Sequence, residues 1–116
     1  MGVKENLEKV LSELKNVNGV EGYAFVREDG LPLINNLEKD IDLINLCSSC
    51  ASINQSGNTL KNFNSVIIEY TEGNNLLIRK TDEETLLVCL TSKNANLSEI
   101  LEKMKNLTKQ IKMIIS

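Results

Sequence analysis

Few residues in this sequence carry the side chains that enzymes use, and the cysteines are the clearest of them. Cys47 and Cys50 form a Cys-x-x-Cys pair, a spacing found in redox sites and in half of many zinc sites. The chain has three cysteines and no histidine, which together cannot supply the four ligands of a structural zinc site. Free cysteine also packs as a small apolar residue. We therefore interpret the pair as part of a helix core and expect neither a metal site nor a cofactor.

The other polar motifs give no stronger indication of catalysis. Without histidine there is no Ser-His or Cys-His nucleophile, and neither familiar glycine-rich phosphate-binding motif occurs. Asp82-Glu83-Glu84 could form an acid–base or metal site, but a solvated turn is the simpler interpretation. Arg27 and Arg79 are the only arginines, and either could act on a GTPase as an arginine finger. We interpret both as solvated strand residues and predict that the chain is not an enzyme; an enzyme that uses Cys47 or Cys50 is the least favoured alternative.

The composition is typical of a soluble globular domain. The 116 residues carry a formal net charge of −3, and 41% are hydrophobic but only 3% aromatic. Mixed charges give no basic face for nucleic acid, and the scarce aromatic side chains give no stacking surface for single strands. No apolar run approaches the roughly 18 residues of a membrane helix, and the N-terminus lacks the apolar region of a signal peptide. We expect a single domain over residues 1–116 in the cytoplasm, with no nucleic-acid partner and no membrane insertion.

The stretch from Gly19 to Leu33 organises the first half of the chain. An amphipathic pattern over residues 3–17 predicts a helix that leads directly into it. From Gly22 the residues become aromatic and β-branched, which favours a strand. Asp29-Gly30 then predicts a tight turn, and residues 31–33 predict a short return strand whose proline suits the edge of a sheet.

The second half reads as three strands and a closing helix. Apolar runs predict strands at residues 66–70, 76–79 and 85–90, separated by short turn-like segments. These runs do not alternate apolar with polar residues, which indicates that both faces of the sheet are covered by helices. The pattern of residues 97–111 predicts an amphipathic helix at the end.

A further helix is predicted from Ile41 to about Lys61, with Asp40 or Asp42 as its cap. One apolar stripe of this helix would pack on the chain's own sheet: Leu43, Leu46, Cys50, Ile53, Gly57 and Leu60. A second, adjoining stripe consists mainly of small residues, which allow another backbone to approach closely: Ile44, Cys47, Ser48, Ala51 and Gln55. The helix is either a plain core helix or one that packs this second stripe against another helix. A second copy of the chain would supply that helix.

The order helix, hairpin, helix, three-strand meander, helix resembles the roadblock/dynein light chain family. The residues that carry the resemblance are Leu14-x-x-Val17-x-Gly19-Val20-x-Gly22, Asp29-Gly30-Leu31-Pro32-Leu33, Val66-Ile67-Ile68-Glu69 with Leu76-Leu77-Ile78, and the helix Leu97 to Ile111. The resemblance implies an α+β fold of the roadblock/longin/profilin-like αββαβββα type. Its five-stranded antiparallel sheet has the order 2-1-5-4-3, with the second helix on one face and the first and third helices on the other.

The resemblance also implies a homodimer. The strand at residues 66–70 would lie at a sheet edge, and an apolar edge without proline invites pairing with another chain. In this family the third strands of two copies meet and the second helices pack side by side. The predicted dimer interface therefore comprises Ile44, Cys47, Ser48, Ala51, Ser52, Gln55, Val66, Ile67, Ile68, Glu69 and Tyr70.

The function implied by the resemblance is a non-catalytic homodimeric interaction module. It would bind or regulate a small Ras-like GTPase of the P-loop class, or scaffold a larger complex. A protein without a nucleotide site changes GTP turnover only by favouring one arrangement of the GTPase's own switch loops. The alternative is a small-ligand sensor domain with a pocket between sheet and helix.

Overall fold

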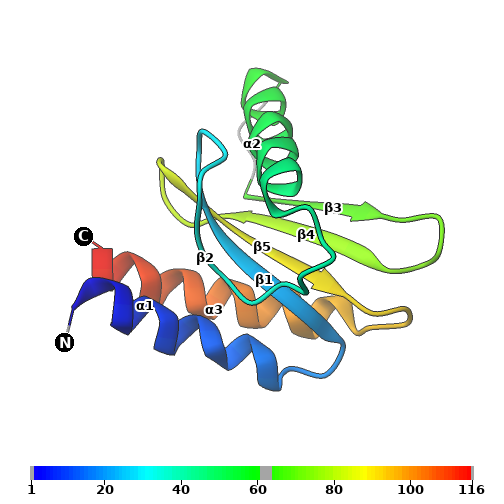
Figure 1. The fold of residues 1–116 in the computed structure, drawn as a ribbon, viewed down its shortest axis with the longest axis horizontal. Helices are drawn as coiled ribbons and strands as arrows, with labels where there is room; N and C mark the ends of the chain where they lie inside the picture. Colours follow the sequence, from blue (N-terminus) through cyan, green and yellow to red (C-terminus); the bar gives the residue numbers. More distant parts are fainter. Residues whose placement is uncertain (1, 61–63, 116) are drawn as a thin grey trace.

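The chain forms a five-stranded antiparallel sheet with helices on both faces (Figure 1). A computed structural model describes residues 2–60 and 64–115. The elements are α1 (Val3–Leu11), the 3-10 helix η1 (Ser12–Asn16), β1 (Val20–Arg27), β2 (Pro32–Asn35), α2 (Leu43–Leu60), β3 (Ser65–Glu69), β4 (Asn75–Lys80), β5 (Thr85–Thr91) and α3 (Leu97–Ile115). The strand order β2-β1-β5-β4-β3 confirms the order implied by the resemblance.

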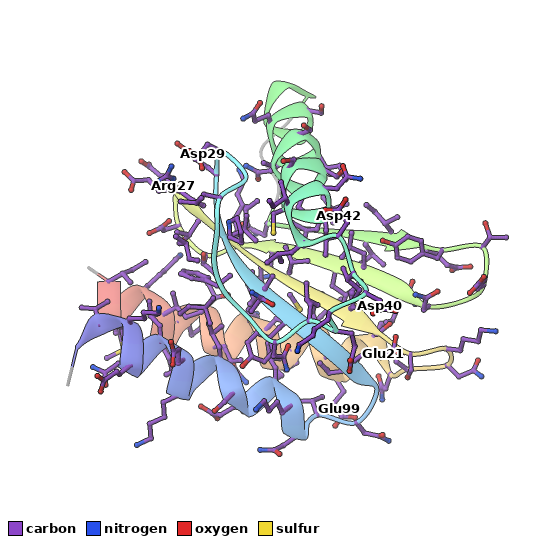
Figure 2. All side chains as sticks on the ribbon, viewed as in Figure 1. Glu21, Arg27, Asp29, Asp40, Asp42 and Glu99 are labelled. Atoms are coloured by element: carbon purple, nitrogen blue, oxygen red, sulfur yellow. The ribbon has the colours of Figure 1, made fainter. Side chains whose placement is uncertain are left out.

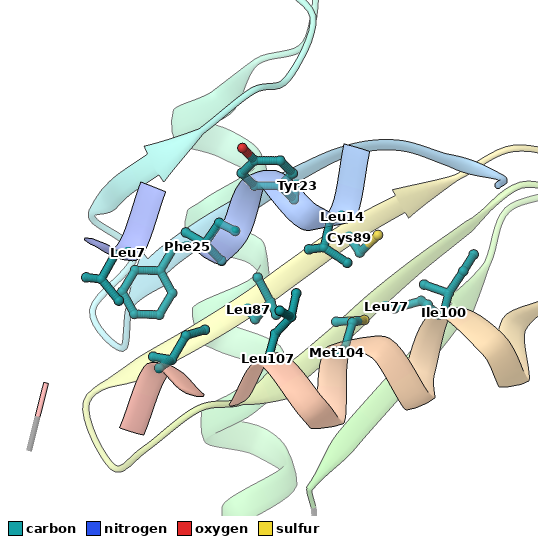
Figure 3. Packing of buried hydrophobic residues seen from close by; sticks show 12 residues of the cluster. Leu7, Leu14, Tyr23, Phe25, Leu77, Leu87, Cys89, Ile100, Met104 and Leu107 are labelled. Carbon is teal, nitrogen blue, oxygen red and sulfur yellow. The ribbon is translucent and has the colours of Figure 1, made fainter. Parts of the chain in front are cut away.

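Two apolar clusters, one on each face of the sheet, hold these layers together. Helix α2 covers one face, and α1 and α3 run side by side over the other (Figure 1). Strand β5 serves both clusters: Leu87 and Cys89 pack toward α1 and α3, whereas Leu86 and Val88 pack toward α2. Figure 3 shows the first cluster, in which Phe25 and Leu87 lie among side chains of α1 and α3. The prediction that both faces are covered is confirmed.

Several predicted boundaries differ from the structure near the hairpin. The first helix is α-helical only to Leu11 and then tightens into η1, a common way for a helix to end. Strand β1 begins at Val20 rather than Gly22, and β2 covers Pro32–Asn35 rather than residues 31–33. Ile34 pairs with Phe25 and therefore belongs to the sheet, beyond the predicted end of the strand. The polar residues that follow it are tolerated because an edge strand needs little burial.

The second helix begins where an aspartate caps it. The side chain of Asp42 accepts a hydrogen bond of 3.1 Å from the backbone N–H of Asn45, and its carbonyl accepts one from Leu46. The described helix starts at Leu43, not Ile41, because Asp42 itself is the cap. The predicted end at about Lys61 lies outside the described residues. No helix among the described residues is long and apolar enough to span a membrane.

Candidate protein-interaction surfaces

Strand β3 forms one edge of the sheet and contains no proline. Val66 and Ile68 pack toward α2, where they join the apolar cluster on that face. Ile67 points to the opposite face, because successive strand residues alternate, and it remains 47% exposed. An exposed isoleucine on an unpaired edge strand is the feature that invites another strand to pair.

The free backbone groups of β3 can be assigned from its bonds to β4. Lys80 donates to the carbonyl of Asn64 at 3.0 Å, and Tyr70 donates to the carbonyl of Asn74 at 2.8 Å. Antiparallel strands alternate between residues that bond to the neighbour and residues that face away. Since the register of β3 with β4 has no shift, the residues facing away are Ser65, Ile67 and Glu69. Their N–H and C=O groups have no strand beyond them among the described residues.

A groove separates β3 from the nearest side of α2. Its volume is about 410 Å³, and its lining includes Asn45, Leu46, Ser49 and Ile53 of α2 with Ile68 and Tyr70 at β3. Leu46 and Ile53 are only partly buried, although both belong to the cluster under α2. The groove is therefore an apolar surface that adjoins the unpaired strand edge.

The other side of α2 lies against the turn of the β1–β2 hairpin. Gly30 has a φ of +96°, and a Cβ atom added there would lie 3.2 Å from the Cα of Ser48. Ile44 is 71% exposed and borders a hollow that the hairpin lines with Leu31 and Pro32. Figure 2 shows Arg27 and Asp29 at the hairpin tip beside α2, with Asp42 at the start of that helix. The small residue at Ser48 is thus explained by a contact within the chain.

This geometry divides the residues predicted for the dimer interface. Cys47 and Ala51 are buried within the chain itself. Ile44 and Ser48 lie toward the hairpin rather than toward β3, while Ser52 and Gln55 are exposed. The groove residues Asn45, Leu46, Ser49 and Ile53 were not among the residues predicted for the interface. Leu46 and Ile53 had been assigned to the chain's own sheet, and nothing in the sequence indicated that they would be only partly covered.

Comparison with known proteins identifies the fold. No family model and no curated protein matches the chain. Among solved structures, the gliding protein MglB of Thermus thermophilus aligns with a TM-score of 0.88 at 18% identity, covering 98% of this chain and 91% of that one. A roadblock/LC7 domain of Streptomyces avermitilis gives 0.76 at 14% identity, covering 94% and 93% of the two chains. MglB of Myxococcus xanthus gives 0.77 at 13% identity, covering 97% and 93%. The chain has the roadblock/LC7 fold.

Within this roadblock fold the cysteines are core residues. Cys47 and Cys50 pack under α2, and Cys89 packs toward α1 and α3. Burial raises the pKa of Cys50 and of Cys89 to about 12, and it raises the pKa of the Cys47 thiol. A buried thiol with a raised pKa is protonated at neutral pH and is a poor nucleophile or metal ligand. Among the described residues, no group of three potential metal ligands comes together.

The acidic segment Asp82-Glu83-Glu84 forms the turn between β4 and β5. The carboxylate of Asp82 accepts a hydrogen bond of 2.8 Å from the backbone N–H of Glu84 and one of 2.7 Å from the hydroxyl of Thr85. These bonds close the turn between β4 and β5 in the way that Asp commonly does. Glu83 and Glu84 are exposed.

The two arginines have different environments. Arg27 forms an ion pair of 2.6 Å with Asp29 in the hairpin turn, and both side chains are about half exposed. Arg79 is partly buried in β4, and its Nε is a buried atom without a hydrogen-bond partner among the described residues. The prediction of a solvated strand residue therefore fits Arg27, whereas Arg79 is only partly exposed and its Nε is shielded from water. A buried donor without a partner calls for an explanation.

Proposed function

We propose that this roadblock-fold protein is a non-catalytic homodimer that binds a small Ras-like GTPase and either regulates it or scaffolds a larger complex. The observation that supports the proposal best is the bare β3 edge beside the apolar groove of α2. Among the described residues, neither surface contains a cysteine or a group of metal ligands, and both are suited to contact with protein. The buried cysteines support a role without catalysis.

The homodimer would extend the sheet across two β3 strands. Pairing would satisfy the outward-facing backbone groups of Ser65, Ile67 and Glu69. It would bring the groove side of each α2 toward the other copy, so that Leu46 and Ile53 lose their remaining contact with water. Burying apolar surface stabilises an interface by roughly 25 cal/mol per Å² before the costs of association are counted.

The dimer is tested by its mass and by a matched pair of α2 variants. Size-exclusion chromatography with light scattering should give twice the chain mass of 12.9 kDa. Ser49→Arg places a long charged side chain in the groove and should raise the dimer Kd at least about tenfold. Ile44→Arg makes the same kind of change on the hairpin side and should leave the mass unchanged. A monomeric wild type, or equal effects of the two variants, would overturn this dimer.

The GTPase partner is proposed from the resemblance to the roadblock family, which implies a role in binding or regulating a small GTPase. The chain shares its fold with MglB proteins and with an MglC of Myxococcus xanthus. Since the chain lacks a phosphate-binding motif, it would influence a GTPase by binding one arrangement of its switch loops. A differential affinity is therefore the measurable property. A tenfold preference for one nucleotide state corresponds to about 1.4 kcal/mol.

The GTPase is tested in two steps. Small P-loop GTPases of the source organism that co-purify with the chain are identified and produced in pure form. Titration calorimetry then measures binding of the GDP-loaded and GTP-analogue-loaded forms to the wild-type dimer and to the Ser49→Arg variant. The proposal expects binding that prefers one nucleotide state and depends on the dimer. Absence of binding by every purified GTPase would contradict it.

A small-ligand sensor is the second candidate function. A polar hollow of about 490 Å³ lies between the first helical segment and the β1–β2 hairpin, with Lys4, Lys15 and Tyr23 in its lining. That volume is within the range of small-molecule pockets. Native mass spectrometry of the purified protein should detect a co-purified small molecule if this function is correct. A protein that carries none, under conditions that preserve the dimer, argues against it.

A further inference from the structure

Arg79 lies in the sheet without an ion-pair partner among the described residues of its own chain. It sits directly opposite Ser65 on one side and Leu87 on the other, on the face that α1 and α3 cover. Its Nε is buried without a hydrogen-bond partner, and neither ion pair among the described residues involves it. Leaving a buried N–H donor without a partner is costly, so an acceptor from outside the chain that orders the guanidinium would stabilise it.

Glu69 is the acidic residue of β3, but it cannot serve Arg79 of the same chain. Glu69 lies opposite Asn75, whereas Arg79 lies opposite Ser65. Four residues along a strand correspond to about 13 Å, which separates the two side chains widely. Both belong to the same face of the sheet, because directly opposed residues share a face and residues two apart repeat it.

The outward-facing residues limit how two β3 strands can pair. In a symmetric antiparallel pair, outward-facing residues must meet outward-facing residues, because each exchanges both of its hydrogen bonds with the residue opposite. The register that uses Ser65, Ile67 and Glu69 together places Ile67 opposite Ile67 of the second copy. The same register places Ser65 opposite Glu69 of the second copy. A slip by two residues removes at least one of these pairings.

In that register the carboxylate of Glu69 from the second copy lies within reach of Arg79. One row across the extended sheet then reads Leu87, Arg79 and Ser65 of one copy, followed by Glu69 of the second copy. Neighbouring strands are about 4.8 Å apart, so Arg79 and that glutamate are about 10 Å apart at the backbone. Serine is short, and an extended arginine and a glutamate together can bridge this distance over it. The two-fold symmetry creates the contact twice, once on each side of the paired isoleucines.

We propose that Arg79 of each copy pairs with Glu69 of the other, and that these two ion pairs fix the register of the β3–β3 seam. The inference rests on the proposed homodimer and goes beyond it, because it names the residues that select one register. Arginine suits the role, since its guanidinium presents several donors in a planar fork to a carboxylate. The partner it fits is a second copy of this chain.

Charge reversal and mixing test the proposal on the full chain. Glu69→Arg alone and Arg79→Glu alone each place two like-charged pairs in a homodimer, and each should raise the Kd about tenfold or more. An equimolar mixture of the two variants restores both pairs in the heterodimer, one with each polarity. The mixture should therefore associate with a Kd within about threefold of wild type, as measured by light scattering and by analytical ultracentrifugation with one variant fluorescently labelled. Glu72→Arg makes the same charge change at an exposed position of the β3–β4 turn and should not alter the Kd.

The outcomes separate this inference from the homodimer itself. A monomeric wild type overturns the homodimer, whereas a dimeric wild type whose variants show no rescue on mixing overturns only the ion pairs. If circular dichroism shows that Arg79→Glu does not fold, the salt dependence decides. The wild-type Kd should then rise between low and high salt, and the Kd of Glu69→Gln should rise several-fold less. Equal salt dependence of the two proteins would overturn the proposal.

Discussion

The two edges of the sheet are built in opposite ways. At the β2 edge, Pro32 has no N–H to offer, the strand covers only Pro32–Asn35, and its pairing with β1 shifts between Phe25 and Val26. The Asn35 side chain accepts a hydrogen bond of 3.1 Å from the backbone of Leu37, just beyond the strand. A short strand, a proline and an irregular register are the devices by which proteins prevent edge pairing. The β3 edge has a regular register and no proline.

This difference indicates where a partner strand can add. A sheet with one blocked edge and one open edge extends in one direction only, so pairing of two open edges gives a closed dimer rather than a fibre. The hairpin side of α2 belongs to the blocked half of the molecule, because Gly30 holds the turn against Ser48. The groove side of α2 belongs to the open half. The two halves are therefore expected to respond differently to substitution.

The largest expected effect comes from a charge at the centre of the open edge. Ile67→Lys places two lysines directly opposite each other in the proposed dimer and removes an apolar contact. The dimer Kd should rise about a hundredfold or more, because like charges opposed across strands are destabilising and the buried area is lost. Light scattering over a concentration series measures it. Leu33→Lys is the matched control on the blocked edge, where the leucine is 38% exposed against 47% for Ile67. Equal loss of dimer in both variants would show that the edges do not differ.

The sequence was sufficient to predict the helices and strands, but not which side of α2 lies next to β3 and which side lies next to the hairpin. Continuous apolar runs in β4 and β5 correctly indicated a sheet covered on both faces, since burial on each face leaves no polar positions. The sequence pattern of α2 could not reveal which side of the helix faces β3. Ile44 lies on the hairpin side and Leu46 on the β3 side, but both are apolar. That information is in the position of the hairpin, which the contact of Gly30 with Ser48 reveals. The buried Nε of Arg79 was equally hidden, because an isolated arginine in a strand is usually solvated.

An intermediate effect is expected where the hairpin meets α2. Gly30→Ala should lower the free energy of unfolding by about 1–3 kcal/mol, because its φ of +96° strains any side chain and the new Cβ crowds the Ser48 backbone. The melting temperature should fall by about 4 °C for each kcal/mol. Gly73 is the matched control, since its φ is +101° but an added Cβ would meet only the Lys93 side chain, at 3.5 Å. Gly73→Ala should therefore cost less than Gly30→Ala. Equal losses would mean that backbone strain alone decides, and that the contact with Ser48 adds nothing.

The smallest effect is expected from the ion pair at the tip of the blocked half. The Arg27 guanidinium lowers the pKa of Asp29 from its ordinary value of 3.8 to about 2, with a further contribution from the Leu31 backbone N–H. Because the folded-state pKa lies below the unfolded one, the stabilisation is present above pH 3.8 and is lost as the pH falls toward 2. The Arg27 and Asp29 side chains are both exposed, so solvent screens the ion pair, and loss of the pair at low pH should hardly change the melting temperature. NMR titration of the Asp29 carboxyl carbon should show the lowered pKa in the wild type and a value nearer 3.8 in Arg27→Gln. The dimer Kd should be the same in the wild type and in Arg27→Gln, because the hairpin tip lies far from the open edge. An ordinary pKa of Asp29 in the wild type would mean that the hairpin tip is not held in this geometry.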